Sequence, residues 1–256
     1  MTTLTDSEIR KLMDAGQLIY NGNLARIGPA SYELRASGIY YDLTVSDRPI
    51  DAAATGGVIL IKPGHRVVLI TMESLVVPSN VLARIASKGS LFSVGLSPVS
   101  TYADPGFEGQ LGLVTQNSSD KYLVLPIGEP VAKVDFSTLT AAVSKPYRGQ
   151  HGYGTQVWPI RYDLQKTYDE VKHYPGVLSE SAEANKIIPA ATATALAELK
   201  GNQIKVNIGL VFALAANTIM YAVISNKALD ISISIFTNLI SSALIGLLLY
   251  IQQKKS

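Results

Sequence analysis

The chain has 256 residues, of which 47% are hydrophobic and 16% charged, and its net charge is +2. A charge so close to neutral, without a Lys/Arg cluster interleaved with aromatic residues, gives no support for nucleic-acid binding. The absence of cysteine excludes disulfides, thiolate metal sites and a cysteine nucleophile. The three histidines, His65, His151 and His173, are far apart in sequence, so no protein-bound metal is expected.

The N-terminal segment Met1–Gly16 is polar and predicts a capped helix. It lacks the apolar core of a secretion signal. We therefore expect the residues that precede the apolar C-terminal part to stay in the cytoplasm.

After this helix, short runs rich in Val, Ile, Leu and Tyr alternate with Gly, Pro, Asn and Asp. The runs are Gly38–Val45, Val58–Ile61, Arg66–Thr71, Val81–Ala86, Gly109–Thr115 and Tyr122–Leu125. Turns are predicted at Pro63-Gly64, Asp104-Pro105-Gly106 and Pro126–Gly128. Strands at such regular intervals are typical of an all-β sandwich or barrel.

Five segments in order carry more specific patterns. They are Leu4–Ile9 with Gly16–Ile19; Gly28–Arg35, similar to S-x-D-L-R; Ser87–Leu91 with Gly95-Leu96; Tyr102–Gln110 with Asn117; and Tyr147–Gly149 with Gly152–Gln156. Over residues 4–160 the chain resembles the dCTP deaminase/dUTPase superfamily, and its deaminase branch in particular. The third segment falls where that superfamily binds phosphate, and the fourth matches its D-P-G-[FY]-x-G hairpin.

The resemblance implies a mainly β protein, a dUTPase-like distorted β-barrel (β-clip) that assembles as a homotrimer with nucleotide sites shared between subunits. It implies that Asp104 orients a catalytic water, with Mg²⁺ carried on the nucleotide triphosphate. The residues expected to bind the nucleotide and its phosphates are Lys88, Gly89, Ser90, Gln110, Arg148 and Tyr153. Lysine and serine offer charge and a hydroxyl to phosphate, and glycine allows close backbone approach.

Three positions depart from the deaminase pattern. The glutamate that moves protons in deaminases stands three residues before the motif Asn, where this chain has Val114. Valine cannot act as a general acid or base. The Ser and Arg that help activate the water correspond to Gly89 and Ser93. Deamination is therefore predicted to be lost, and Glu108, expected in the hairpin turn, is not expected to replace the missing glutamate.

Two uncharged stretches close the chain, 206–224 with 19 residues and 231–251 with 21. Each is long enough for a transmembrane helix, which needs roughly 20 residues. The short connection between them predicts a hairpin. Lysines lie mainly outside the hairpin, at Lys200, Lys205, Lys254 and Lys255. By the positive-inside rule, both termini and the β domain are expected on the cytoplasmic side of a plasma or inner membrane.

Polar residues recur on both predicted helices. Asn217 and Asn238 lie equally far from the centre of the loop, so they are expected at the same depth. Such a stripe packs the hairpin together, or it faces other subunits or a water path in an oligomer. The sequence leaves both interpretations open.

The predicted organisation is a nucleotide-binding domain (1–161), a partly helical connector (162–203), two membrane helices (204–251) and a cytoplasmic tail (252–256). One hypothesis is a nucleotide sensor that controls its membrane helices, an architecture that resembles effectors of bacterial antiphage systems. The alternative is an active membrane-anchored dCTP deaminase or dUTPase. A scaffold that has lost its ligand is the third possibility. The expected partners are a nucleotide, the lipid bilayer and further copies of the chain.

Overall fold

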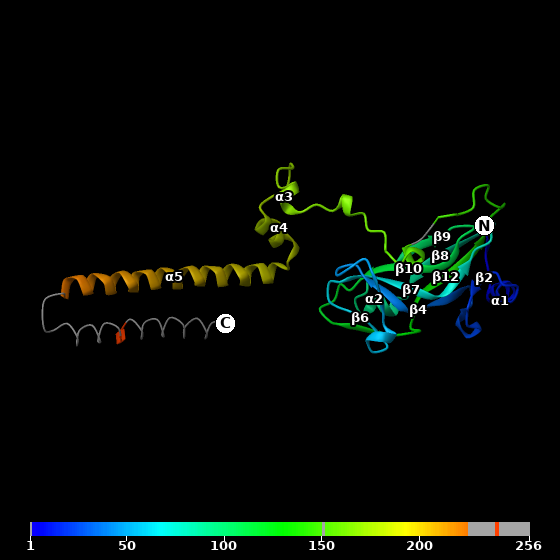
Figure 1. The fold of residues 1–256 in the computed structure, drawn as a ribbon, viewed down its shortest axis with the longest axis horizontal. Coiled ribbons are helices and arrows are strands. Elements are labelled where there is room, and N and C mark those ends of the chain that lie inside the picture. The colour runs from blue at the N-terminus through cyan, green and yellow to red at the C-terminus, as the bar shows by residue number, and fades with distance from the viewer. Residues whose placement is uncertain (1, 150–151, 225–238, 241–256) are drawn as a thin grey trace. The chain divides into compact units, whose positions relative to one another are not determined.

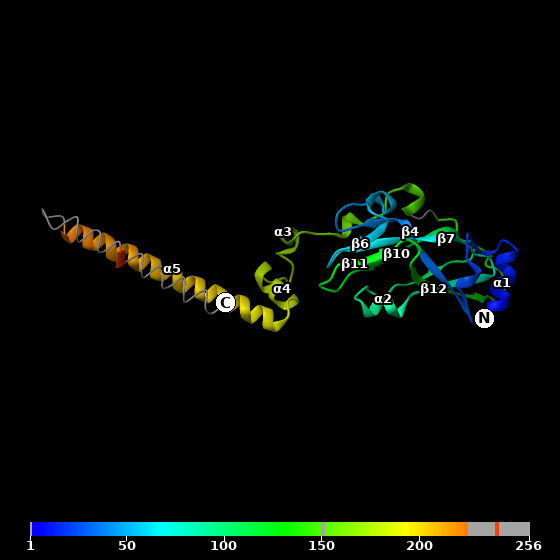
Figure 2. The same ribbon diagram turned by 90° about the horizontal axis from the view of Figure 1, so that it is seen from below.

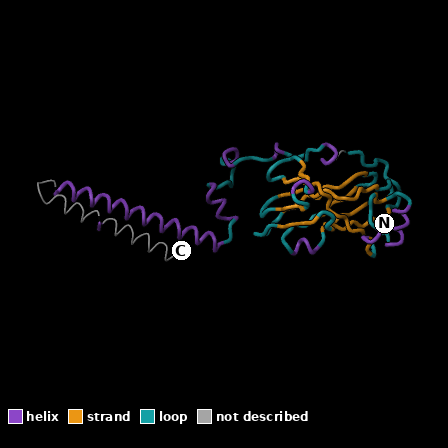
Figure 3. Tube along the Cα trace, turned by 60° about the horizontal axis from the view of Figure 1, so that its bottom comes forward, coloured by secondary structure: helices purple, strands orange, loops and turns teal. Residues whose placement is uncertain are grey.

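The structure is a computed structural model that describes residues 2–149, 152–224 and 239–240. The chain divides into two compact units, Met1–Tyr162 and Asp163–Ser256, which are described separately. The first unit is rich in strands and the second is helical (Figures 1 and 3).

The first unit is built almost entirely from strands. Its elements are β1 (Thr2–Thr3), α1 (Asp6–Asp14), β2 (Leu18–Tyr20), β3 (Ile27–Gly28), β4 (Ser31–Asp42), β5 (Pro49–Asp51), β6 (Val58–Ile61), β7 (Arg66–Val76), β8 (Val81–Ser87), α2 (Gly89–Ser93), β9 (Ser100–Ala103), β10 (Glu108–Gln116), β11 (Leu123–Pro126) and β12 (Pro130–Thr138). The six predicted runs all contain strand, so the mainly β prediction is confirmed. Strands β9 and β12 had not been predicted.

The strands form one curled sheet in the order β10-β7-β4-β12-β8-β9, with β6 and β11 as a separate antiparallel pair (Figure 2). Strand β4 joins the two halves of the large sheet. Its first residues, from Tyr32 to Arg35, pair with β12, whereas Ala36 and the residues after Ser37–Ile39 pair with β7. The register shifts between Ala36 and Tyr40, which allows the strand to bend. One strand therefore carries side chains into both halves of the sheet.

The concave side of the sheet holds the hydrophobic core. Its largest fully buried side chains include Tyr32, Phe136, Ile9, Leu18, Leu34, Ile59, Ile61, Leu75, Ile85 and Leu113. Helix α1 begins with a capping box, in which Thr5 and Glu8 each accept a hydrogen bond from the other's backbone N–H. The predicted N-terminal helix is thus confirmed, and it seals the core through Ile9.

The second unit contains α3 (Tyr168–Val171), α4 (Glu180–Ile187) and α5 (Ala190–Ile224), while a 3₁₀ turn at Tyr162–Leu164 spans the boundary. None of the described helices is both long and apolar enough to cross a bilayer. The membrane span predicted at 206–224 is therefore not supported. This part of α5 includes Asn207, and an amide is costly to bury without a hydrogen-bond partner. The span predicted at 231–251 falls outside the described residues except for Leu239 and Ile240, and Asn238 also lies outside them.

Candidate functional site

The predicted phosphate-binding residues lie where β8 gives way to the short helix α2. Lys88 is the N-cap of α2, and Gly89 and Ser90 form its exposed first turn. No atom lies within 4 Å of the position that a β-carbon at Gly89 would occupy, so the backbone there is open to a ligand. The Ser93 hydroxyl donates to the Ser90 carbonyl at 2.7 Å. The structure thus places three predicted residues together in an accessible turn.

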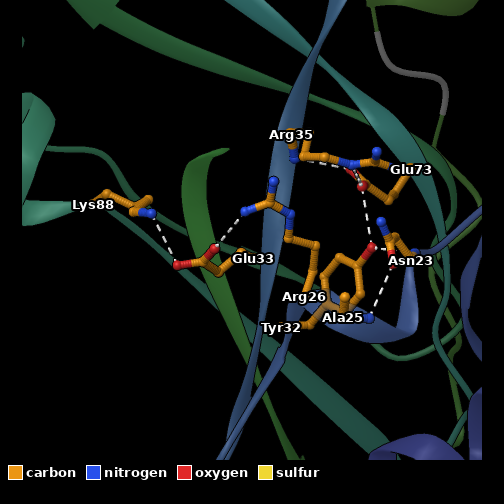
Figure 4. Close-up of polar contacts among 8 residues, drawn as sticks. All are labelled: Asn23, Ala25, Arg26, Tyr32, Glu33, Arg35, Glu73 and Lys88. Carbon is orange, nitrogen blue, oxygen red and sulfur yellow. Dashed lines mark hydrogen bonds and ion pairs between the residues drawn. The ribbon is translucent and has the colours of Figure 1, made fainter. Parts of the chain in front are cut away.

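Lys88 reaches across the sheet to a carboxylate on β4. Its Nζ lies 2.9 Å from Glu33 Oε1, and Arg26 Nη1 lies 3.3 Å from Glu33 Oε2 (Figure 4). The side chains of Lys88 and Glu33 are 22% and 24% exposed. Two cations therefore share one accessible carboxylate, which leaves the cluster with a net positive charge.

The same contacts perturb the titration of Glu33. The hydrogen bond from Lys88 is the main cause that lowers the pKa of this carboxyl, and Arg26 adds to the effect against partial burial. Glu33 is therefore ionised at neutral pH and holds Lys88 by charge. A phosphate that binds at α2 must compete with Glu33 for this lysine.

Asp104 occupies the tight hairpin between β9 and β10. The hairpin is held by three backbone hydrogen bonds: Phe107 N to Asp104 O, Gly106 N to Val77 O, and Tyr147 N to Pro105 O. Gly106 has φ +92°, which an L side chain rarely adopts. The Asp104 side chain is exposed and makes no hydrogen bond or ion pair with any other described residue. The carboxylate is thus rigidly mounted but free to act on a ligand.

Asp104 and Lys88 lie at opposite ends of the β8–β9 pair. Ala103 pairs with Ala83, so Asp104 follows near Leu82, six residues from Lys88 along β8. Six residues of extended chain span about 20 Å. Within one copy of the chain, the phosphate-binding turn and the Asp104 hairpin therefore cannot meet around one small ligand.

Strand β10 contains three positions considered from the sequence, Glu108, Gln110 and Val114. Gln110 donates from Nε2 to the Thr71 carbonyl at 2.6 Å, so its side chain is tied to β7. Val114 is 47% exposed and pairs with Val68. Glu108 is the first residue of β10 and is not part of the turn, which corrects the prediction. Strand β10 ends the order of strands, but the outer edge at its C-terminal end is already occupied, since the Gln116 carbonyl accepts from Ser97 N at 2.8 Å.

The domain that carries these residues is similar to proteins of one known family. Residues 3–139 match the family model described as dCTP deaminase-like. The chain belongs to the dCTP deaminase-like family. It is 31% identical over 148 residues to a dCTP deaminase of Thermococcus kodakarensis, which covers 58% of this chain and 90% of that protein. It is 27% identical over 166 residues to a dUMP-forming dCTP deaminase of Methanosphaera stadtmanae, covering 57% and 84%.

A solved structure of a dCTP deaminase from Agrobacterium tumefaciens also matches. It shares 18% identity, with a TM-score of 0.46, and covers 53% of this chain and 47% of that one. A dUTPase of Staphylococcus bacteriophage 80alpha matches with 12% identity and a TM-score of 0.35, covering 52% and 91%.

The segment that follows the dCTP deaminase-like match packs back onto the domain. Tyr147 stacks near Phe107 at 5.6 Å between ring centroids, and Arg148 is exposed beside it. Tyr153 lies in the 3₁₀ turn Gly152–Thr155. The structure thus brings the start of this segment to the Asp104 hairpin.

Farther along, Trp158 docks on the outer face of the β4–β7–β10 region. Its ring lies 5.7 Å from that of Tyr41, tilted by 54°, and the backbone N–H of Trp158 donates to the Asp47 carbonyl at 3.1 Å. A β-carbon at Gly112 would overlap the indole. Sequence reasoning did not identify this contact, although the presence of a single tryptophan just after the domain was a signal.

A second polar cluster lies inside the dCTP deaminase-like domain. Glu73 is fully buried and accepts from Arg35 Nε at 2.6 Å, Arg35 N at 2.9 Å and the Tyr32 hydroxyl at 3.1 Å. The Tyr32 oxygen in turn accepts from Asn23 N at 2.7 Å. This cluster, shown on the right of Figure 4, ties β4 to β7 and faces the core. It is structural and was not predicted, although a lone carboxylate in an apolar strand is a signal for it.

One further carboxylate has a histidine partner. Asp42 Oδ2 lies 2.8 Å from His65 Nδ1, and Asp42 also caps the turn at Thr44. Within the residues that the structure describes, no three His, Cys, Asp or Glu side chains gather closely enough to hold a metal ion.

Proposed function

We propose that the dCTP deaminase-like domain binds a pyrimidine deoxynucleoside triphosphate without deaminating it, and that the bound state is sensed by the helical unit that follows. The proposal is carried by Val114, the residue that motif spacing, counted back from Asn117, places where deaminases have their glutamate. The names of the relatives, dCTP deaminases, support the class of ligand.

The surroundings of Val114 support the loss of deamination. Its cross-strand neighbour Val68 is fully buried in a small apolar cluster with Tyr41 and Ile70, on which Trp158 packs. Directly opposed residues on paired strands share one face of the sheet. A carboxylate at position 114 would stand beside this apolar cluster, at a position that is 47% exposed. Valine fits the apolar face, and it cannot transfer a proton.

The turn at Lys88 supports retention of phosphate binding. Lys88 and Arg26 provide two cations against the single carboxylate of Glu33, and Gly89 and Ser90 offer an exposed backbone and a hydroxyl. Charge-assisted hydrogen bonds to phosphate are stronger than neutral ones. We therefore assign the triphosphate to this turn.

The distance of about 20 Å between the Lys88 turn and the Asp104 hairpin favours a site completed by a second copy of the chain. We propose a homotrimer in which the Lys88 turn of one copy faces the Asp104 hairpin and β10 of the next. Any Mg²⁺ would then enter bound to the triphosphate oxygens, since no described group of side chains forms a metal site.

Incubation of the full chain with dCTP or dUTP and Mg²⁺, followed by product analysis, tests the proposal. Either nucleotide should raise the melting temperature, and no dUTP, dUMP or pyrophosphate should form. Lys88→Ala should weaken this stabilisation. Conversion of dCTP to dUTP by the wild-type protein would refute the loss of deamination, and no stabilisation by any nucleotide would refute the proposed binding.

Hydrolysis of the triphosphate is a second candidate function. The exposed Asp104 carboxylate in its rigid hairpin favours it, because a water-orienting carboxylate needs to be accessible and fixed. Release of pyrophosphate that is abolished in Asp104→Asn, with nucleotide binding preserved, would establish this activity. The isosteric amide leaves the hairpin backbone unchanged.

A mixing experiment tests the shared site. Lys88→Ala and Asp104→Ala chains should each bind nucleotide weakly when pure, because alanine, unlike the isosteric asparagine, removes the hydrogen-bonding group that position 104 offers to the nucleotide. After co-refolding, mixed trimers should regain part of the binding, because some sites then combine an intact Lys88 with an intact Asp104. If the mixture binds no more nucleotide than the two pure variants, or if the protein has a monomeric mass in solution, the proposed assembly is contradicted.

A further inference from the structure

The Trp158 indole fills a notch that depends on a glycine. It packs on Tyr41 and Val68, and its benzene ring reaches the position where Gly112 has no side chain. Any larger residue at position 112 would displace the ring. The sequence thus combines one tryptophan with the glycine that admits it, across 46 residues of chain.

The notch lies beside the proposed base site. Gly112 stands between Gln110 and Val114 on β10, the last strand in the order of the large sheet. A base that hydrogen-bonds to the outer edge of β10 near Gly112 would therefore lie next to the tip of the indole. Trp158 is only partly buried, which leaves part of the ring open for contact.

We propose that Trp158 forms an aromatic wall of the base site and determines affinity for the base of the nucleotide. This inference rests on the proposed function. Trp158 lies beyond residues 3–139, where the family model matches, so the wall belongs to the segment that this chain adds after its dCTP deaminase-like core. Stacking of a base on an aromatic side chain tolerates different bases, because every base has a π-face.

Trp158 also lies close in sequence to the start of the helical unit. The backbone N–H of Trp158 donates to the Asp47 carbonyl, and the boundary with the helical unit follows at Tyr162. A base that contacts the indole therefore acts on a residue four positions before that boundary.

The test uses the fact that Trp158 is the only tryptophan in the chain. Its fluorescence in the full-length protein should change saturably on addition of dCTP or dUTP. Inorganic tripolyphosphate, which offers phosphates without a base, should bind at the Lys88 turn and leave the fluorescence unchanged. Binding of tripolyphosphate is followed independently by calorimetry.

Substitutions then separate base contact from folding. Trp158→Ala should weaken dCTP binding by about fivefold or more, the range expected for loss of one base stack. Tripolyphosphate binding should stay within about twofold of the wild type, since stacking contributes nothing to it. Trp158→Phe keeps an aromatic ring, so its affinity for dCTP should lie between those of the wild type and Trp158→Ala. It serves as the second variant if Trp158→Ala does not fold.

The outcomes are distinct. If Trp158→Ala weakens the binding of dCTP and of tripolyphosphate equally, Trp158 has only a structural role and the proposed aromatic wall is refuted. Tighter dCTP binding by Trp158→Ala would show that the indole obstructs the site and would overturn it as well. If the wild-type protein binds dCTP no better than tripolyphosphate, no base is recognised and the inference falls. If it binds neither ligand, the proposed function itself fails.

Discussion

Two carboxylates on neighbouring strands of the same sheet meet cations in different surroundings. Glu73 on β7 is fully buried and receives three hydrogen bonds, from Arg35 and Tyr32. Glu33 on β4 remains about a quarter exposed and pairs with Lys88 and Arg26. Glu33 and Tyr32 are adjacent on β4, and Figure 4 shows them pointing to opposite sides of the strand.

The difference shows how burial decides what an ion pair can do. A buried pair that loses one member leaves an uncompensated charge, so it is fixed in place. A pair that water reaches contributes little to stability and can be exchanged for another anion. In this fold the buried cluster holds two strands together, and the exposed cluster is available to a phosphate.

The largest expected effect comes from removing the buried carboxylate. Glu73→Ala leaves Arg35 without its partner and the Tyr32 hydroxyl without its acceptor. We expect the free energy of unfolding to fall by about 3–5 kcal/mol, measured by urea denaturation. Glu33→Ala is the matched control and should cost less than about 1 kcal/mol. Similar losses in both variants would remove the distinction between the two clusters.

A smaller effect is expected from alkaline pH. Burial, together with Glu73, raises the pKa of Tyr32 to about 12 from its ordinary value of 10. A raised pKa means that the fold favours the protonated phenol, so this stability is present below pH 10 and is lost as pH rises toward 12. Two pKa units correspond to about 2–3 kcal/mol.

The comparison with Tyr32→Phe isolates this contribution, because other tyrosines and lysines titrate in the same range. The difference in unfolding free energy between wild type and variant should shrink between pH 10 and pH 12. A difference that stays constant with pH would show that Tyr32 ionises as freely in the fold as in the unfolded chain.

The smallest effect on stability is expected at the exposed cluster. Glu33→Gln should change the free energy of unfolding by less than about 1 kcal/mol. It releases Lys88 and Arg26 from a competing charge, so tripolyphosphate should bind up to about fivefold more tightly in calorimetry. Weaker binding would mean that Glu33 positions Lys88 for the phosphate and does not compete with it.

Acid titration provides the control for this variant. The pKa of Glu33 is lowered by Lys88, so its contribution is present above the ordinary value of 4.5 and is lost as pH falls below it. Wild type should therefore lose slightly more stability than Glu33→Gln in this acidic range. An identical acid profile would show that the ion pairs of Glu33 do not contribute.

Local signals in the sequence were sufficient for several elements. The polar segment Met1–Gly16 predicted the capped helix that is α1, and the run Val58–Ile61 matched β6. Strand β12 was not predicted, because Pro130 and the charges of Lys133 and Asp135 weaken the apolar pattern. These charges are tolerated on the outer face of a strand whose inner residues are covered by the core.

The site was predictable only in part, for a physical reason. Motif order predicted Lys88, Gly89, Ser90 and Asp104 as site residues, and this stays a prediction. Glu33 lies 55 residues before Lys88, and local sequence does not encode that pairing. The contact between Trp158 and Gly112 is equally non-local. Both depend on which strands become neighbours in the sheet.

The position of β12 has a consequence for folding during synthesis. This strand is the last of the large sheet to be made, yet it lies in the middle, between β4 and β8, and it also pairs with Thr2–Thr3 of β1. Until residues 130–138 leave the ribosome, both neighbouring strands expose unpaired edges. We expect the nascent domain to need chaperone protection up to that point and then to close in one cooperative step.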